Sequence, residues 1–192
     1  MGKVVVTEFI TLDGVIESPG GGEGFEHDGW SFKFTRGDEA DKFKYDELIE
    51  AGAQLLGRVT YQGFARAWPS MAGSEFGDRM NSMPKYVVSN SLSDANATWT
   101  NSTVIRDDVV NQIKRLKDKV AGDILVAGSA KLVQFLAAHD LVDEYRLMVF
   151  PVVLGSGKRL FADGTAHTVL RLVDTKPVGP DGVLILTYRP AR

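Results

Sequence analysis

Two short apolar segments of the chain each end in a glycine and lead into a predicted helix. One is Leu55–Gly57 and the other is Ile124–Gly128. Where a strand of an α/β protein passes into a helix in this way, N–H groups at the helix start can bind phosphate. The pair predicts a site for a phosphorylated dinucleotide. The residues expected to contact it are Gly57, Arg58, Thr60, Gly128, Ser129 and Leu132.

Each junction also has a simpler interpretation. Gly57 suits a turn beside a surface arginine, although the forked guanidinium of Arg58 also suits a 2′-phosphate. The Gly128–Ser129 step is not the Gly-x-Gly-x-x-Gly fingerprint of an ordinary Rossmann domain, so it is also consistent with a plain strand-to-helix turn. Ser89 and Asn90 end another predicted strand, where they either reach an adenosine phosphate or cap a turn.

A second group of candidate residues lies in the expected loops. Asp13 follows the first strand and either borders the reacting groups or forms a tight turn with Gly14. The loop 25–30 combines aromatic and titratable side chains with glycine, which is typical of a lid over a ring-shaped substrate. His27 and Trp30 are therefore placed in the site, the alternative being a loop pinned by its aromatic rings. The proton donor is left open between water and an acid within 13–30.

Five segments of the chain carry a family resemblance. Three of them resemble elements of dihydrofolate reductases: Leu56–Phe64, Pro84–Asn90 and Val126–Leu132. Two more resemble a narrower branch, the reductase domain of the bifunctional riboflavin-biosynthesis deaminase-reductase and its stand-alone relatives: Phe9–Ile16 and Val149–Gly157. The resemblance extends over residues 2–189.

This resemblance implies an NADPH-dependent reductase and a homodimer. It implies hydride transfer from the nicotinamide to a C=O or C=N carbon, with 5-amino-6-(5-phosphoribosylamino)uracil as the model substrate. Asp13 would border nicotinamide and substrate, with His27 as the second catalytic candidate. Gly155, Lys158 and Arg159 would hold a substrate phosphate, unless they form an exposed loop. Two alternatives stay open: dihydrofolate reduction, and a nucleotide-binding protein without turnover.

Dihydrofolate reductases hold the pterin ring with one acidic side chain on the first long helix. The candidate acids on the matching helix here, residues 38–52, are Asp38, Glu39, Asp41, Asp46 and Glu47. Charges cover most of that helix, which favours a solvated face and disfavours dihydrofolate as the substrate.

The length, composition and net charge of the chain exclude several classes of protein. The 192 residues suit one domain, residues 1–192, and 44% hydrophobic with 24% charged residues is ordinary for a globular protein. A net charge of −3 without a basic stripe disfavours nucleic acid, and no apolar run is long enough to span a membrane. The absence of cysteine excludes the zinc deaminase half of the riboflavin enzyme. Three scattered histidines predict no metal site, and a cytoplasmic location is expected.

Hydrophobic periodicity predicts an α/β fold, and the resemblance implies that this fold is dihydrofolate-reductase-like. We expect a three-layer sandwich with a mixed, mostly parallel sheet, helices on both faces and a C-terminal antiparallel hairpin. Strands are predicted over 3–10, 54–56, 86–88, 124–127, 144–149, 168–176 and 183–189. Helices are predicted over 38–52, 60–68, 107–120 and 130–139. The segment 70–83 has no clear period and is predicted to be a loop that allows one helical turn.

Overall fold

One eight-stranded sheet organises the computed structural model, which describes residues 1–165 and 167–191. The strands are β1 (Val4–Thr11), β2 (Ala51–Gly57), β3 (Lys85–Val88), β4 (Ser102–Ile105), β5 (Asp123–Val126), β6 (Glu144–Phe150), β7 (Leu170–Val178) and β8 (Val183–Pro190). The α-helices are α1 (Gly37–Glu50), α2 (Arg58–Ala67), α3 (Glu75–Ser82), α4 (Val109–Lys119) and α5 (Ala130–Ala138). Three 3₁₀ turns complete the elements: η1 (Trp30–Lys33), η2 (Trp68–Met71) and η3 (Asp94–Asn96).

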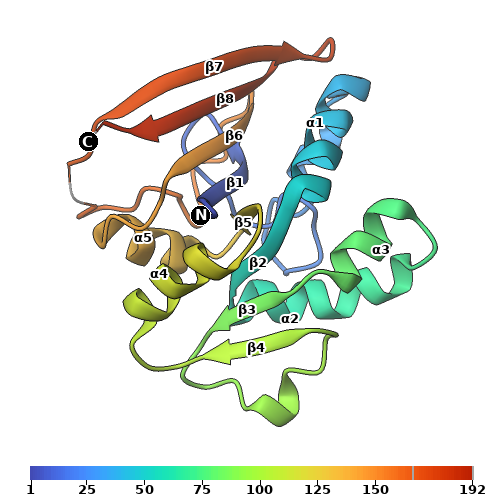
Figure 1. The fold of residues 1–192 in the computed structure, drawn as a ribbon. Coiled ribbons are helices and arrows are strands. Elements are labelled where there is room, and N and C mark those ends of the chain that lie inside the picture. The colour runs from blue at the N-terminus through green and yellow to red at the C-terminus, as the bar shows by residue number, and fades with distance from the viewer. Residues whose placement is uncertain (166, 192) are drawn as a thin grey trace.

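The strand order is β4-β3-β2-β5-β1-β6-β8-β7, and the first six strands are mutually parallel (Figure 1). The hairpin β7–β8 adds antiparallel to β6 at one side of the sheet. This confirms the predicted mostly parallel sheet with its C-terminal hairpin. Parallel strands need crossover connections, and the helices supply them.

The helices cover both faces of the sheet, as expected for strands that are apolar throughout. On one face, Val4 and Val6 of β1 pack in one core cluster with residues of α4 and α5. On the other face, Val5 belongs to a second cluster that includes α1, α2 and α3. A third cluster joins the start of α1 to the end of β6 and the C-terminal hairpin.

Helix α3 corrects the prediction of a loop over 70–83. Ser74 caps the helix by accepting the Gly77 N–H at 3.1 Å, and Glu75 and Asp78 lie in its first turn, where acids are favourable. Only Met80 and Gly77 are buried in it, so its apolar period is too weak to detect. The capping serine followed by an acid was the available signal.

The prediction that the first helix ends at Gly52 is also wrong. Helix α1 ends at Glu50, and Gly52 lies inside β2. A Cβ atom at Gly52 would collide with the Ala121 carbonyl, so the glycine permits β2 and the α4–β5 connection to approach closely. The short strand β4 was not predicted either; it is an outer strand that pairs only with β3.

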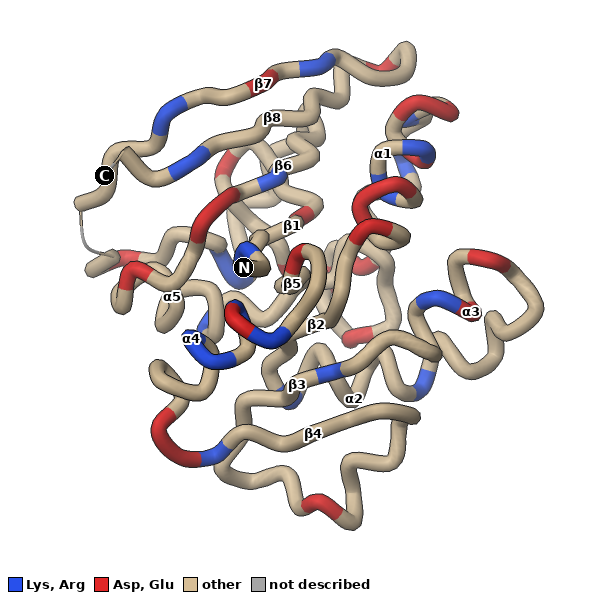
Figure 2. Tube along the Cα trace, in the orientation of Figure 1, with Lys and Arg blue, Asp and Glu red and all other residues tan. Residues whose placement is uncertain are grey.

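Charged residues of both signs are distributed over all parts of the trace (Figure 2). Among the described residues, none of the helices is long and apolar enough to cross a membrane. In the same residues, no group of three or more His, Asp and Glu side chains is placed to hold a metal ion.

Candidate cofactor and substrate site

The carboxyl ends of β2 and β5 form the centre of the candidate site. These strands are neighbours in the sheet, and each passes directly into a helix, β2 into α2 and β5 into α5. The two helices lie on opposite faces, because Tyr61 of α2 and Leu132 of α5 belong to different core clusters. Neighbouring parallel strands whose helices leave on opposite faces open a crevice at their carboxyl ends, where α/β proteins bind ligands.

Hydrogen bonds tie the two helix starts together across this crevice. The Gly57 N–H donates to Ser129 Oγ at 2.9 Å, and the Ser129 N–H donates to Thr60 Oγ1 at 3.0 Å. Leu132 packs beneath this junction within the core. The structure thus brings together the two glycine junctions that the sequence predicted as one site, although they are about 70 residues apart in the chain.

Gly128 has a conformation that requires glycine. Its φ is +59°, and a Cβ atom there would lie 2.9 Å from Thr60 Oγ1. Its N–H donates to Glu8 Oε2 at 3.0 Å. The N–H groups of Gly57, Gly128 and Ser129 are therefore all engaged within the protein. In α5 the Leu132 N–H already donates to the Ser129 carbonyl at 2.7 Å. The donors that suit a phosphate are therefore the N–H groups of Ala130 and Lys131 and those at the start of α2.

Arg58 is the first residue of α2 and its side chain is exposed, with Nη1 donating to Gln62 Oε1 at 3.0 Å. On the neighbouring strand, Val88 pairs with Gly57, so Ser89 and Asn90 follow at the same edge of the sheet. Ser89 Oγ accepts the Leu92 N–H at 3.0 Å and caps a turn, while Asn90 is exposed. Arg58 and Asn90 thus extend the crevice toward β3.

Asp13 lies in a loop cluster at the end of β1. Its carboxylate accepts hydrogen bonds from Thr11 Oγ1 at 2.6 Å, from the Gly155 N–H at 2.8 Å and from the Leu154 N–H at 3.2 Å. Slight burial opposes ionisation, but these hydrogen bonds outweigh it and lower the pKa of Asp13. Arg159 Nε donates to the Asp13 carbonyl at 3.0 Å. The structure therefore brings Asp13, Gly155 and Arg159 together, with Asp13 as a carboxylate that positions the loop.

The remaining candidates lie around the same loops. Trp30 is completely buried, and its Nε1 donates to the Glu17 carbonyl at 2.8 Å, which matches the alternative interpretation that it pins the loop. His27 is partly exposed, with Nε2 3.4 Å from Glu26 Oε1. The Lys158 ammonium forms an ion pair with Glu17, so its charge already has a partner. None of these three side chains contacts the α2–α5 junction through a hydrogen bond that the structure describes.

The acids of α1 behave as expected with one exception. Asp38, Glu39 and Asp41 are exposed, whereas Glu47 is buried, which corrects the expectation of a wholly solvated face. Glu47 Oε1 accepts from Thr7 Oγ1 at 2.6 Å and from Lys44 Nζ at 2.5 Å.

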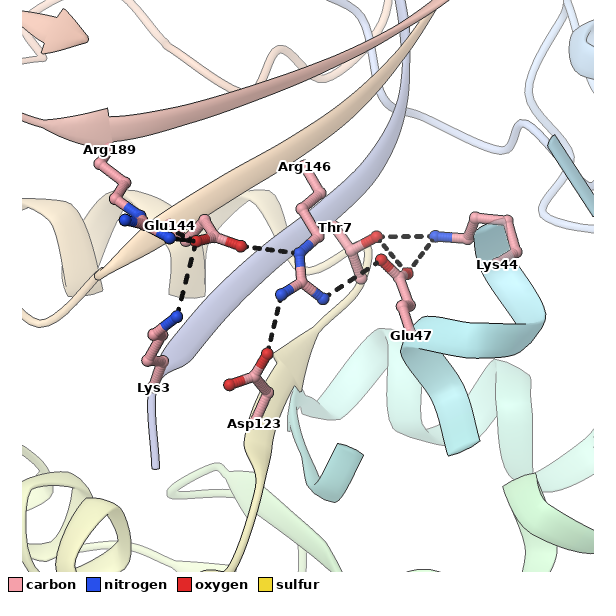
Figure 3. Close-up of polar contacts among 8 residues, drawn as sticks. All are labelled: Lys3, Thr7, Lys44, Glu47, Asp123, Glu144, Arg146 and Arg189. Carbon is pink, nitrogen blue, oxygen red and sulfur yellow. Dashed lines mark hydrogen bonds and ion pairs between the residues drawn. The ribbon is translucent and has the colours of Figure 1, made fainter. Parts of the chain in front are cut away.

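Glu47 belongs to an ion network that crosses the amino half of the sheet (Figure 3). Arg146 lies at its centre, 2.8 Å from both Asp123 and Glu144, and 3.9 Å from Glu47. Burial alone would raise the pKa of Glu144, but hydrogen bonds from Arg189 and Arg146 outweigh it and lower that pKa. Lys44 and Arg146 thus compensate the charge of Glu47, while its buried Oε2 has no hydrogen-bond partner among the described residues.

Glu8 is the residue of this site that was not predicted. It is buried and reaches the Gly128 N–H from β1. The signal was a single acid within the apolar segment Val4–Ile10, since a buried carboxyl needs a specific partner.

Comparison with known proteins agrees with this geometry. The chain matches the family model described as the RibD C-terminal domain over residues 2–184. The uncharacterised protein YyaP of Bacillus subtilis (strain 168) is 28% identical over 190 residues, which are 97% of this chain and 94% of that protein.

Solved structures share the fold at low sequence identity. A putative riboflavin biosynthesis protein from Shewanella sp. PV-4 has a TM-score of 0.77 at 20% identity, covering 100% of both chains. Dihydrofolate reductase from Enterococcus faecalis, complexed with NADP(H), has a TM-score of 0.60 at 18% identity, covering 100% of this chain and 98% of that one. A deaminase/5-amino-6-(5-phosphoribosylamino)uracil reductase from Thermotoga maritima has a TM-score of 0.63 at 17% identity, covering 99% of this chain and 57% of that one. The fold is therefore dihydrofolate-reductase-like, and the chain belongs to the RibD C-terminal domain family.

Proposed function

We propose that this chain is an NADPH-dependent reductase of the riboflavin-pathway type. The observation that carries the proposal is the crevice between β2 and β5, where α2 and α5 start side by side and are tied together through Ser129. Two helix starts aimed at one crevice suit a diphosphate, and Arg58 adds a cation at its β3 side. Membership of the RibD C-terminal domain family supports the same assignment.

The residues of the chain fit such a cofactor. First-turn N–H groups of α2 and α5 would bind the diphosphate, Arg58 would bind the 2′-phosphate, and Asn90 would contact the adenosine end. Gly57, Thr60, Gly128 and Ser129 would fix the crevice rather than donate to the phosphates. When bound, the reduced nicotinamide supplies a hydride for a C=O or C=N carbon.

The loop cluster at the end of β1 would form the substrate side. Asp13, as a carboxylate, would hold the loop that contains Gly155, and Trp30 would anchor the segment that carries His27. His27 and water both stay candidates for proton delivery. A substrate phosphate would compete with Glu17 for Lys158 and would also meet Arg159.

We propose a phosphorylated ribosylamino-pyrimidine as the first substrate to test, in preference to dihydrofolate. Among the α1 acids, only Glu47 is buried, and Lys44 and Thr7 already hold it. Ala40, which faces the core near the start of α1, has no polar group to offer a pterin ring. This arrangement disfavours the grip that a dihydrofolate reductase needs.

The test is equilibrium titration with NADPH, followed by turnover assays. We expect NADPH to bind, and its oxidation to be faster with the ribosylamino-pyrimidine phosphate than with dihydrofolate. Binding of NADPH without oxidation by any carbonyl or imine substrate would favour a nucleotide-binding protein. No binding of NADPH or NADH would refute the proposed function.

A further inference from the structure

Glu8 is a buried acid at the crevice, and one of its carboxyl oxygens has no hydrogen-bond partner among the described residues. Its residue is 4% exposed and lies on β1 on the same face as Val6 and Ile10, toward α5. Oε2 accepts the Gly128 N–H, whereas Oε1 is fully buried and has no hydrogen-bond partner among the described residues. Buried polar atoms nearly always have a partner, so an unpartnered one beside a ligand crevice points to a group on the ligand.

The backbone explains why Glu8 lies at this point. β1 pairs with β5 only from Val4 to Val6, but it pairs with β6 as far as Thr11. The last pair is Val6 with Val126, and Glu8 and Gly128 each follow two residues later. The hydrogen bond between Glu8 and Gly128 therefore bridges the place where the two strands separate, at the ligand-binding edge of the sheet.

The protonation state of Glu8 determines what Oε1 can offer. Burial raises the pKa of Glu8 well above that of an ordinary carboxyl, and the Gly128 N–H and the charge of Lys44 offset only part of this. Glu47, which also lies on α1, acts in the opposite direction to Lys44. The raised pKa favours the uncharged acid, in which Oε2 accepts from the Gly128 N–H and Oε1 carries a proton that it can donate.

The position of Glu8 on β1 indicates which end of a bound dinucleotide lies near it, the nicotinamide end or the 2′-phosphate end. Arg58 follows β2, Gly128 follows β5, and Glu8 lies on β1, so the three are arranged in order along the sheet. With the 2′-phosphate end at Arg58 and the diphosphate at the α2 and α5 starts, the ring end extends toward β1. The carboxamide is the hydrogen-bonding group of that ring, and it is uncharged.

We propose that Glu8 is a positioning residue that donates a hydrogen bond from Oε1–H to the carboxamide oxygen of the nicotinamide ring. The inference rests on the proposed function, because it needs the cofactor in the crevice. It gives the chain a residue that distinguishes the ring end of the cofactor from its phosphates. An ionised carboxylate at the same place would instead repel the diphosphate.

The test compares NADPH with 2′-phospho-ADP-ribose, which lacks the nicotinamide ring. Glu8→Leu removes the donor, and we expect NADPH affinity to fall by roughly tenfold, the effect of one buried hydrogen bond, with little change for the ringless ligand. Glu8→Gln keeps an acceptor for Gly128 and a donor for the ring, so it should retain both affinities. Glu144→Gln is the matched control, a buried acid at the start of β6 and away from the crevice, and it should leave the preference between the two ligands unchanged.

Two results would overturn the inference. Equal weakening of both ligands in Glu8→Leu would show a structural role, and tighter binding of both ligands by Glu8→Gln would show that the native side chain is ionised. Infrared difference spectra give a readout that needs neither ligand nor the leucine variant. The wild-type protein at neutral pH should show the carbonyl band of a protonated carboxyl that Glu8→Gln lacks, and its absence would also refute the inference. If the wild-type protein binds neither ligand, the proposed function fails instead.

Discussion

Ser129 Oγ accepts the Gly57 N–H at 2.9 Å and so joins the start of α5 to the start of α2. The same residue donates its own N–H to Thr60 Oγ1, so its hydroxyl and its N–H both bridge the two helices. Ser129 adopts a left-handed backbone conformation, with φ of +59°, directly after Gly128 with the same value. Gly128 adopts this conformation without steric strain, but it is costly for Ser129, and the hydrogen bonds across the crevice hold Ser129 in place.

Ser129→Ala should therefore lower both stability and cofactor affinity. The substitution keeps the left-handed strain but leaves the Gly57 N–H without its acceptor, which costs about 1 kcal/mol of unfolding free energy. Ser129→Gly removes the same hydroxyl and relieves the strain, so it should be the more stable of the two variants. Denaturant unfolding with NADPH titration measures both effects. Equal stability of the alanine variant and the wild type would contradict the role of the cross-link.

Arg58→Ala should remove the preference for the phosphorylated cofactor. We expect NADPH affinity to fall by about 1–3 kcal/mol, the scale of lost charged hydrogen bonds, while NADH affinity changes little. Arg66→Ala, at the exposed far end of α2, is the matched control. Fluorescence titration with both cofactors gives the two constants. Equal affinity of the wild type for NADPH and NADH would exclude Arg58 as the 2′-phosphate ligand.

The sequence predicted the positions of the two helix starts at the crevice. Glycine at the ends of two apolar strands identified both helix starts, because parallel strands bring their carboxyl ends to one edge. The sequence did not show that the Gly57 N–H donates to Ser129 or that the Gly128 N–H donates to Glu8. Those contacts depend on strand order, which places β5 between β2 and β1, and no local pattern encodes that order.

The role of Trp30 could not be predicted from the sequence. An aromatic residue in a glycine-flanked loop fits a lid and an anchor equally well from sequence alone. The choice depends on Phe150, which is 120 positions later in the chain. Its ring packs edge-on against that of Trp30 in the interior, with the ring centroids 5.4 Å apart. Helix α3 was missed for a related reason, since its buried side is only two residues wide.

Lys85 should make stability depend on pH in the alkaline range. Burial lowers the pKa of its ammonium from 10.5 to about 8, while Nζ donates to the carbonyls of Asn81 and Thr100. Between pH 8 and 10.5 the unfolded chain binds more protons at this group than the folded chain, so its contribution to stability rises with pH. Unfolding of wild type and Lys85→Met across this range should show a growing difference in favour of the wild type. Lys119→Met, at an exposed site, should show none.

The C-terminal hairpin should form the interface of a homodimer, as the family resemblance implies. β7 is the outer strand of the sheet and is exposed over most of its length, with Leu172 49% and Leu184 of β8 38% exposed. An exposed strand with apolar side chains invites pairing with a second copy. Light scattering should give about twice the chain mass of 21.0 kDa for the wild type and the single mass for Leu172→Glu. Met71→Glu, exposed on η2, should stay dimeric, and a monomeric wild type would refute the interface.

Lys158 and Arg159 should act on a phosphorylated substrate and not on the cofactor. Both side chains are exposed in the loop after Gly155, where Lys158 pairs with Glu17 and Arg159 bonds to the Asp13 carbonyl. Replacing both with alanine removes two cations from the substrate side, and each charged hydrogen bond to a phosphate is worth about 1.5–3 kcal/mol. We expect a higher KM for the ribosylamino-pyrimidine phosphate and an unchanged Kd for NADPH.

A single variant, Glu17→Gln, distinguishes a substrate-phosphate site from a loop in which the two cations only stabilise the structure. Glu17→Gln frees Lys158 from its ion pair while keeping a side chain that can accept the Lys158 N–H. If Lys158 binds the substrate phosphate, this variant should lower KM, because the phosphate no longer competes with a carboxylate. A phosphate-free substrate analogue should show the same KM in all the variants. An unchanged KM in the double variant, or nanomolar binding of a methotrexate-like pterin analogue, would remove the phosphate-site assignment and return dihydrofolate to consideration.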